Sequence, residues 1–194
     1  MKRLDWQTDG TAGRIITFGK LLYKRGLVSG NDGNISERLD SDRIMVTASG
    51  VHKGLMDMSG LLVVNQNGKG MLGTTLPSSE TPMHLAIYNT RKEAGAIIHA
   101  HAPWCIAASL KRDSLDLSQF AEGKLLFPKV EVVPFYAPGT LELAQAAAEA
   151  AKRAQIFILK AHGVVAWGQD LMEAFCLIEQ LENNVKAMAF STFF

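Results

Sequence analysis

Two histidines stand two residues apart in the apolar run AIIHAHA, residues 96–102. A run of this length and composition is typical of a buried strand, and the two-residue period of a strand points His99 and His101 to the same face. Neutral imidazole nitrogens are good ligands for zinc and similar divalent ions. A third histidine, His162, lies in the run ILKAHGVVAWG and would complete a metal site with an open coordination position.

A structural role for these histidines is the alternative. A single histidine in an apolar strand is more often a hydrogen-bonded core residue than a ligand. Two imidazoles buried on one face leave polar nitrogens unsatisfied, at a cost of about 1–3 kcal/mol each, unless something binds them. From the pair alone, both interpretations stay open.

Glu80 begins a predicted helix that leads into the histidine strand. A carboxylate in this place can ligate an ion or act as a base. It can also simply complement the helix dipole in the first turn. His84 follows at i+4 on the same helical face, and we interpret it as structural.

Three clusters of small and polar residues could hold a phosphate locally. They occupy residues 30–36, 47–50 and 78–79, and their backbone amides and short side chains are suitable donors. Each cluster by itself is an ordinary turn sequence. The glycine spacing matches neither a Walker loop nor a dinucleotide fingerprint, which argues against nucleotide binding.

Composition restricts the partners and the compartment. The chain has 194 residues, enough for one domain over residues 1–194, with 20 basic and 19 acidic side chains. This balance provides no field for nucleic acid or an anionic membrane. Two cysteines outside any CxxC motif favour a reducing compartment, and neither a signal peptide nor a membrane span is expected. We expect a soluble, cytoplasmic protein.

Hydrophobic patterns predict helices interleaved with short strands. A hairpin is predicted across residues 39–42, and residues 111–128 are predicted as a loop that could reach a neighbouring subunit. Short hairpins among the helices favour an α/β fold with a central, mainly antiparallel or mixed sheet flanked by helices. Helices are expected near residues 11–25, 79–92, 103–110, 141–154 and 171–188.

The motifs in their order resemble those of the class II aldolase and adducin-like family. They are GNDGNIS (30–36), VTASGVHKG (46–54), PSSE (77–80), HAH (99–101) and KAHG (160–163). With the flanking helices they cover nearly the whole chain. The resemblance implies the family's layered fold, built on a mainly antiparallel sheet.

The resemblance also implies a function. His99, His101 and His162 would hold Zn²⁺, and Glu80 would be the acid/base, touching the ion when substrate is absent. The residues that would bind the phosphate of a sugar phosphate are Asn31, Asn34, Ser49, Gly50, Ser78 and Ser79. The implied activity is cleavage of a ketose 1-phosphate like L-fuculose 1-phosphate to dihydroxyacetone phosphate and a short aldehyde, through a metal-stabilised enediolate. Such enzymes are usually homotetramers with active sites between subunits.

Other activities within the resemblance stay open. They are dehydration of a sugar phosphate, cleavage of a 5-deoxy sugar phosphate and decarboxylation of a phosphorylated keto acid. Family aldolases use a loop tyrosine at the aldehyde end of the substrate, whereas this chain has Phe120 near the matching place. A non-catalytic adducin-like interaction module is the alternative outside enzymes, and the three histidines argue against it.

Overall fold

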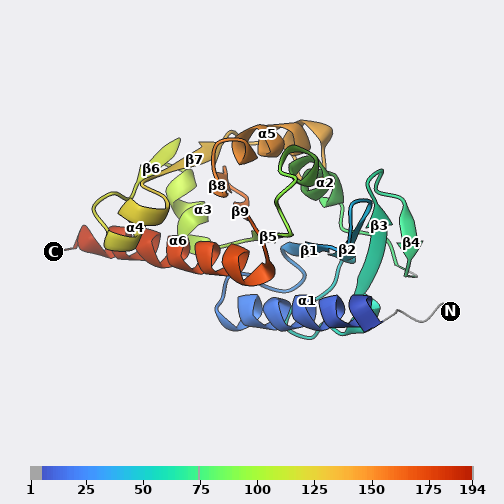
Figure 1. Cartoon of the computed structure of the whole chain (residues 1–194). Coiled ribbons are helices and arrows are strands. Elements are labelled where there is room, and N and C mark those ends of the chain that lie inside the picture. The colour runs from blue at the N-terminus through green and yellow to red at the C-terminus, as the bar shows by residue number, and fades with distance from the viewer. Residues whose placement is uncertain (1–5, 74, 194) are drawn as a thin grey trace.

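A nine-stranded mixed sheet forms the centre of the protein, in the order β4-β3-β2-β1-β5-β9-β8-β7-β6. The computed structural model describes residues 6–73 and 75–193, and helices cover both faces of the sheet (Figure 1). The strands are β1 (Asn34–Arg38), β2 (Arg43–Thr47), β3 (Leu61–Asn65), β4 (Gly70–Leu72), β5 (Ala96–Ala100), β6 (Ser114–Asp116), β7 (Lys129–Val133), β8 (Ile156–Leu159) and β9 (Gly163–Gly168). The helices are α1 (Trp6–Lys24), α2 (Thr81–Thr90), α3 (Pro103–Ser109), α4 (Ala121–Leu126), α5 (Leu141–Ala151) and α6 (Leu171–Ser191), with a 3-10 turn, η1 (Met58–Gly60), before β3.

The sheet is mainly antiparallel. Among the described strands only β7 and β8 pair in parallel. The predicted hairpin joins β1 to β2, and in its turn the Asp40 carboxylate accepts hydrogen bonds from the backbone N–H groups of Asp42 and Arg43. These features confirm the predicted fold class.

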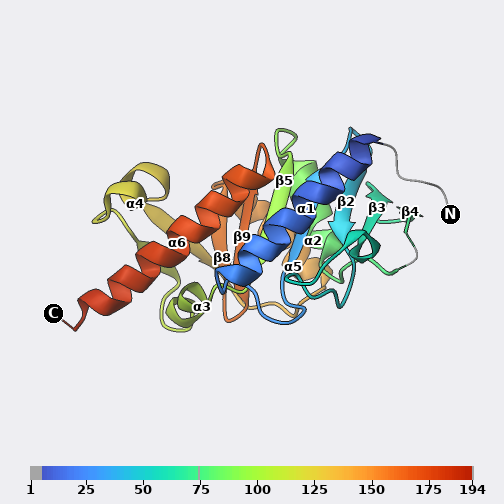
Figure 2. The same ribbon diagram turned by 90° about the horizontal axis from the view of Figure 1, so that it is seen from below.

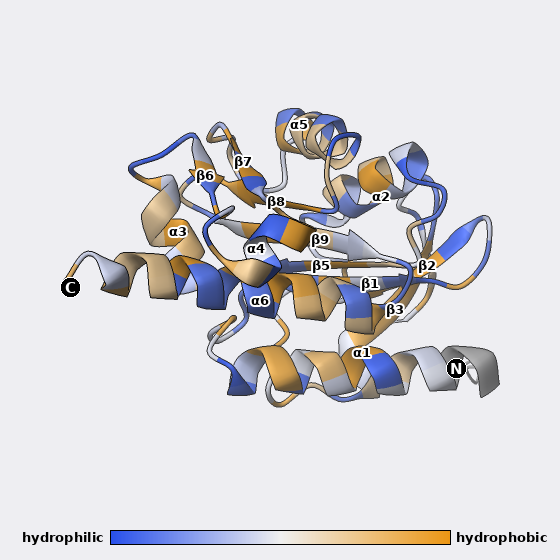
Figure 3. Ribbon diagram, turned by 60° about the vertical axis from the view of Figure 1, so that its left-hand side comes forward, coloured by the Kyte–Doolittle hydropathy of each residue, from blue (hydrophilic) through white to orange (hydrophobic). Residues whose placement is uncertain are grey.

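Each face of the sheet has its own apolar core. Ile87 of α2 and Ala147 of α5 belong to one core, whereas Ile15 of α1 and Ile178 of α6 belong to the other. Figure 2 shows α1 and α6 crossing the strands on the same face. Strands β8 and β9 consist of apolar residues and glycine, whereas β1 is largely hydrophilic (Figure 3). Burial of these two faces is the main driving force for this arrangement.

The central strand β5 is buried along its whole length because helices cover both of its faces. Ile97 packs in the core beneath α2 and α5, whereas Ile98 packs in the opposite core. The two-residue period of a strand therefore places His99 on the α2 side.

The structure corrects the prediction for residues 111–128. This segment contains β6 and α4 rather than a continuous loop. Leu115 and Leu117 are fully buried and extend the core. Elements of three and six residues are too short for an apolar period to appear in the sequence.

Some helices and strands also begin or end at residues other than those predicted. The histidine strand ends at Ala100, so His101 lies beyond it. The helix expected from residue 79 begins at Thr81, with Glu80 at the N-cap position and Ser78 and Ser79 in the preceding turn. None of the helices in residues 6–73 and 75–193 has the length and apolar character that a membrane span requires.

Candidate metal centre and active site

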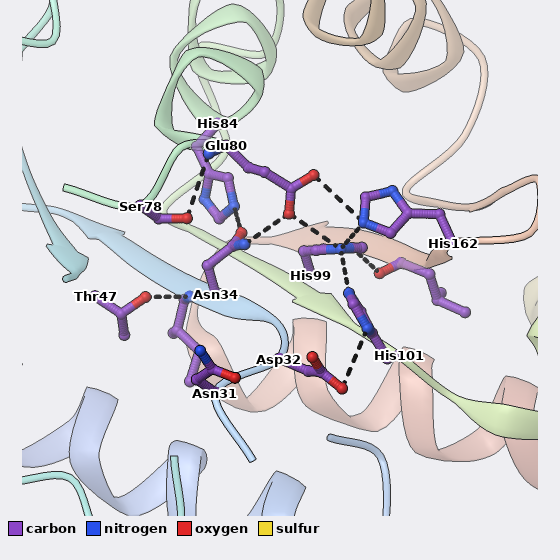
Figure 4. Close-up of polar contacts among 12 residues, drawn as sticks. Asn31, Asp32, Asn34, Thr47, Ser78, Glu80, His84, His99, His101 and His162 are labelled. Atoms are coloured by element: carbon purple, nitrogen blue, oxygen red, sulfur yellow. Dashed lines mark hydrogen bonds and ion pairs between the residues drawn. The ribbon is translucent and has the colours of Figure 1, made fainter. Parts of the chain in front are cut away.

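Side chains from segments far apart in the sequence meet at one end of the central strands (Figure 4). Asn34 opens β1 and pairs with His99 near the end of β5. His162 immediately precedes β9, the other neighbour of β5. Neighbouring antiparallel strands run in opposite directions, so the starts of β1 and β9 lie beside the end of β5.

The structure brings the three predicted histidines together. The Nε2 atom of His99 lies 3.1 Å from that of His101 and 3.3 Å from that of His162. One nitrogen from each ring lies within 4.8 Å of the others. A tetrahedral zinc ion with Zn–N bonds of about 2.0–2.1 Å separates its nitrogen ligands by roughly 3.3 Å. The donor set and its spacing therefore fit a divalent metal ion.

Two of the three rings are oriented through their second nitrogen. The Nδ1–H of His99 donates to the backbone oxygen of Val164 at 3.0 Å, which selects the tautomer that leaves Nε2 free. The Nδ1 atom of His101 lies 3.5 Å from the Asp32 carboxylate. In the part of the chain that the structure describes, the buried Nδ1 of His162 has no hydrogen-bond partner.

An uncommon backbone conformation positions His162. The preceding residue, Ala161, has φ 57°, in the left-handed region that non-glycine residues rarely adopt. Its N–H donates to the buried Ser109 hydroxyl at 3.0 Å. At Gly163, a Cβ atom would overlap the backbone oxygen of Ala100 and the His99 ring, so only glycine fits.

Burial keeps two of the rings in the neutral form that a metal ligand requires. The pKa of His99 is well below its ordinary value because the ring is buried, and the nearby His162 and His101 lower it further. The pKa of His101 is also lowered, first by burial and then by His162. At pH 7 neither ring has to lose a proton before an ion binds.

Glu80 faces the three histidines from the start of α2. Its Oε2 lies 3.3 Å from the Nε2 of His99, and its Oε1 lies 3.5 Å from the Nε2 of His162. The side-chain amide of Asn34 donates to Oε2 at 2.9 Å. No described residue forms a hydrogen bond with the buried Oε1. The carboxylate is therefore held on one side and free on the side of the histidines.

Two loops with candidate phosphate ligands lie side by side next to Glu80. The N–H of Ser49 donates to the backbone oxygen of Leu76 at 2.9 Å, and that of Ser78 donates to Thr47 at 3.3 Å. These bonds join the end of β2 to the turn before α2. The N-terminus of α2 adds a dipole that favours a bound anion. The candidate ligands in these two loops are Ser49, Gly50, Ser78 and Ser79.

The two asparagines of the loop before β1 have different environments. Asn31 is exposed, whereas the side chain of Asn34 is buried between Glu80 and His84. Between them, Gly33 has φ 69°, and a Cβ atom there would lie 2.6 Å from the backbone oxygen of His99. The loop therefore passes close against β5, and the structure directs the Asn34 amide to Glu80 rather than to the open surface.

The sequence analysis missed a buried lysine beneath this loop. The Lys53 ammonium donates to the backbone oxygens of Val51 at 2.8 Å and Asn31 at 3.1 Å. Only 2% of the residue is exposed. Burial lowers the pKa of Lys53 to about 8, and the nearby Asp32 partly offsets this effect.

We expect Lys53 to make the free energy of unfolding depend on pH in the alkaline range. The folded-state pKa lies below the ordinary value of 10.5, so the unfolded chain binds more protons between about pH 8 and 10.5. Stability attributable to Lys53 should rise with pH across this window by about 3 kcal/mol. Urea unfolding of the unmodified protein and of Lys53→Met at several pH values would measure it, and parallel stability curves would contradict the prediction.

The comparison with protein families decides the family. A model described as the Class II Aldolase and Adducin N-terminal domain matches residues 13–189. The chain belongs to this family. The match confirms the resemblance inferred from the sequence motifs.

Relatives in the class II aldolase family carry two activities. The chain is 34% identical over 177 residues to 3-oxo-tetronate 4-phosphate decarboxylase of Haemophilus influenzae, covering 89% of this chain and 83% of that protein. It is 34% identical over 163 residues to L-fuculose phosphate aldolase of Methanococcus maripaludis, covering 84% and 87%. A solved L-fuculose 1-phosphate aldolase superposes with a TM-score of 0.88 at 32% identity, covering 94% of this chain and 86% of that one.

These relatives are aldolases or decarboxylases, and the chain is accordingly an enzyme of the lyase class. Class II aldolases depend on a metal ion, and the three-histidine group meets this requirement.

Proposed function

We propose that the chain is a zinc-dependent aldolase that cleaves a ketose 1-phosphate to dihydroxyacetone phosphate and a short aldehyde. One observation carries the proposal: three histidine nitrogens and the Glu80 carboxylate face a common point. The two loops with candidate phosphate ligands lie next to Glu80. The similarity to L-fuculose phosphate aldolases supports this reaction.

In this proposal His99, His101 and His162 hold the metal ion, and Glu80 also contacts it when substrate is absent. Three neutral imidazoles suit zinc. When bound, the ion supplies a Lewis acid that stabilises negative charge on the substrate oxygens. The three rings keep one coordination side open for substrate.

Glu80 moves the proton. Cleavage releases the hydroxyl proton of the aldehyde fragment to solvent and leaves an enediolate of the phosphorylated three-carbon fragment. The enediolate carbon must then receive a proton, taken from solvent through Glu80, to give dihydroxyacetone phosphate. The Asn34 amide fixes Oε2, which leaves Oε1 to carry that proton. Proton transfer by a positioned side chain typically contributes about 10²–10⁴-fold to the rate.

The phosphate is bound remotely from the bond that breaks. Asn31, Asn34, Ser49, Gly50, Ser78 and Ser79 are the proposed ligands. The side chain of Asn34 is bound to Glu80 and His84, and its backbone pairs with His99 in β5, so Asn34 has the least structural support among these six residues. Contacts at this end fix the substrate's position without taking part in bond cleavage.

Replacing Ser79 by alanine is expected to raise KM for a phosphorylated substrate about tenfold and to leave kcat nearly unchanged, because one hydrogen bond to a charged group is lost. Steady-state kinetics would measure both constants. Ser59→Ala, a matched change in η1, serves as the control. A KM equal to that of the unmodified enzyme would remove Ser79 from the phosphate site.

Decarboxylation of a 3-oxo acid 4-phosphate is a second candidate reaction. When carbon 2 of such an acid carries a hydroxyl group, loss of CO₂ leaves the same enediolate, so the same metal, Glu80 and phosphate loops would serve. An aldolase must also take a proton from the hydroxyl group of the departing aldehyde fragment, whereas decarboxylation needs no base there. Phe120, near the place of the family's tyrosine, cannot accept a proton and packs against the core, which favours this candidate.

A product screen tests the proposal. Zinc-loaded enzyme is offered ketose 1-phosphates and 3-oxo acid 4-phosphates, and release of dihydroxyacetone phosphate is followed with a coupled reductase. We expect chelator-sensitive release from one substrate class, with aldehyde or CO₂ as the second product. Absence of release from both classes by zinc-loaded enzyme would contradict the proposal.

We also propose that the chain forms a cytoplasmic homotetramer with active sites between subunits. The resemblance to the family supports this assembly, and the isolated chain exposes several large apolar side chains, including Leu125 and Phe193. Light scattering of the purified protein would measure the mass, and a stable monomer would contradict this assembly.

A further inference from the structure

A continuous row of buried polar side chains runs from Glu80 away from the histidines. Asn34 and Ser36 share one face of β1, whereas Glu80, His84 and Tyr88 follow one another at helical turns from the N-cap of α2. All five residues are buried. Polar groups from the two elements thus meet within the core beneath α2, where apolar contacts would otherwise be expected.

Hydrogen bonds connect the row from end to end. The Asn34 amide links Glu80 at 2.9 Å to the Nε2 of His84 at 2.5 Å. The Nδ1 of His84 lies 2.7 Å from the Ser36 hydroxyl, which lies 3.0 Å from the Tyr88 hydroxyl. The Tyr88 hydroxyl also donates to the backbone oxygen of Ser36 at 3.1 Å.

The direction of each bond follows from the carboxylate. Ionised Glu80 only accepts, so Asn34 presents its NH₂ group to Glu80 and its oxygen to His84. The Nε2 of His84 must then carry a hydrogen. Burial lowers the pKa of His84 to about 3, so the ring is neutral and its Nδ1 accepts from the Ser36 hydroxyl.

We propose that His84, supported by Ser36 and Tyr88, is a positioning residue that holds the Asn34 amide on Oε2 of Glu80 and thereby reserves Oε1 for proton transfer. The inference rests on the acid/base role proposed for Glu80. Without the His84 donor, the Asn34 amide can rotate away, and Glu80 loses the contact that fixes its orientation. Misplacement of a reacting group by about 1 Å can cost about 10²-fold in rate.

A purely structural role for His84 makes a different prediction. Removing one partner of a buried hydrogen bond leaves the other partner unsatisfied, at a cost of about 1–3 kcal/mol in stability. Such a role would therefore change stability without separating kcat from KM. The positioning role predicts a loss of kcat at constant KM and constant metal content.

The first test needs no substrate. Correlation of the ring ¹⁵N and ¹H signals of His84 in the zinc-loaded protein identifies its tautomer. The positioning chain requires hydrogen on Nε2 and none on Nδ1. Hydrogen on Nδ1 would reverse the donor and acceptor roles along the row of hydrogen bonds and would overturn the proposal, whatever the substrate is.

The second test uses three variants. His84→Phe keeps a ring but no donor, and we expect kcat to fall about 10–100-fold with KM within about threefold and zinc still stoichiometric. His84→Gln supplies one donor and one acceptor, and should recover kcat to within about fivefold of the unmodified enzyme. Met83→Ala, on the apolar face of the same helix, should lower Tm yet leave kcat within about twofold.

The outcomes separate this inference from the proposed function. Equal kcat in His84→Phe and the unmodified enzyme, or equal losses in His84→Phe and Met83→Ala, would overturn the positioning role. If the unmodified enzyme cleaves neither substrate class, the proposed function fails. The crystal structures of His84→Phe and His84→Gln then still test the positioning role of His84. A displaced Glu80 carboxylate in His84→Phe, restored in His84→Gln, supports the positioning chain, and an unmoved carboxylate contradicts it.

Discussion

Replacing His101 by alanine is expected to abolish stoichiometric metal binding and to lower turnover by at least about 10³-fold, a loss of about 4 kcal/mol of transition-state stabilisation. The His101 ring converges with those of His99 and His162 and has its Nε2 3.1 Å from that of His99. Catalytic zinc sites use three protein ligands. Two remaining imidazoles would hold the ion far more weakly, and the open site would lose its Lewis acid.

Metal analysis by mass spectrometry after dialysis, with turnover on the same sample, measures this result. His52→Ala is the matched control, because His52 lies outside the group and contacts Tyr23. We expect one equivalent of metal in the control and far less than one in His101→Ala. Full metal content in His101→Ala would show that the three histidines are not the ligands.

Replacing Glu80 by glutamine should separate metal binding from chemistry. Glutamine keeps the shape and the oxygen that accepts from Asn34, but it cannot take a proton at neutral pH. We expect the metal content and KM to stay close to those of the unmodified enzyme, while kcat falls about 10²–10⁴-fold.

Metal analysis together with steady-state kinetics measures both parts of this prediction. Glu149→Gln is a matched control, because Glu149 is exposed on α5 and pairs with Lys152. Its turnover is expected to stay within about twofold of the unmodified enzyme. A fully active Glu80→Gln enzyme would remove Glu80 from the acid/base role.

Local sequence patterns predicted the layered fold and the meeting of the histidines. Alternation in residues 96–102 placed His99 and His101 on one face, and they converge even though His101 lies beyond the strand. His162 was predicted as the third ligand from its place in a second apolar, strand-like run, and the family resemblance implied the same role. Its approach depends on the pairing of β5 with β9, which no local period shows.

The surroundings of Glu80 could not be predicted in the same way. The spacing of Glu80, His84 and Tyr88 marks one helical face, but their partners Asn34 and Ser36 lie some fifty residues earlier in the chain. Only the packing of α2 over β1 joins the two sets. The family resemblance implied that Asn34 binds phosphate, and its contact with Glu80 comes from that packing.

Lys53 illustrates the same limit. A lysine in VHKG suggests an exposed turn, because lysines are rarely buried. It is buried because the loop before β1 folds over it and supplies the backbone oxygen of Asn31. The sequence around residue 53 predicts neither the covering loop nor this hydrogen bond.

The most direct test of the central claim is an anomalous difference map at the zinc absorption edge, from crystals of the zinc-loaded protein. One strong peak within bonding distance of the Nε2 atoms of His99, His101 and His162 is the predicted result. A map without a peak there, or with its strongest peak on other residues, would contradict the claim that these three side chains hold the catalytic metal.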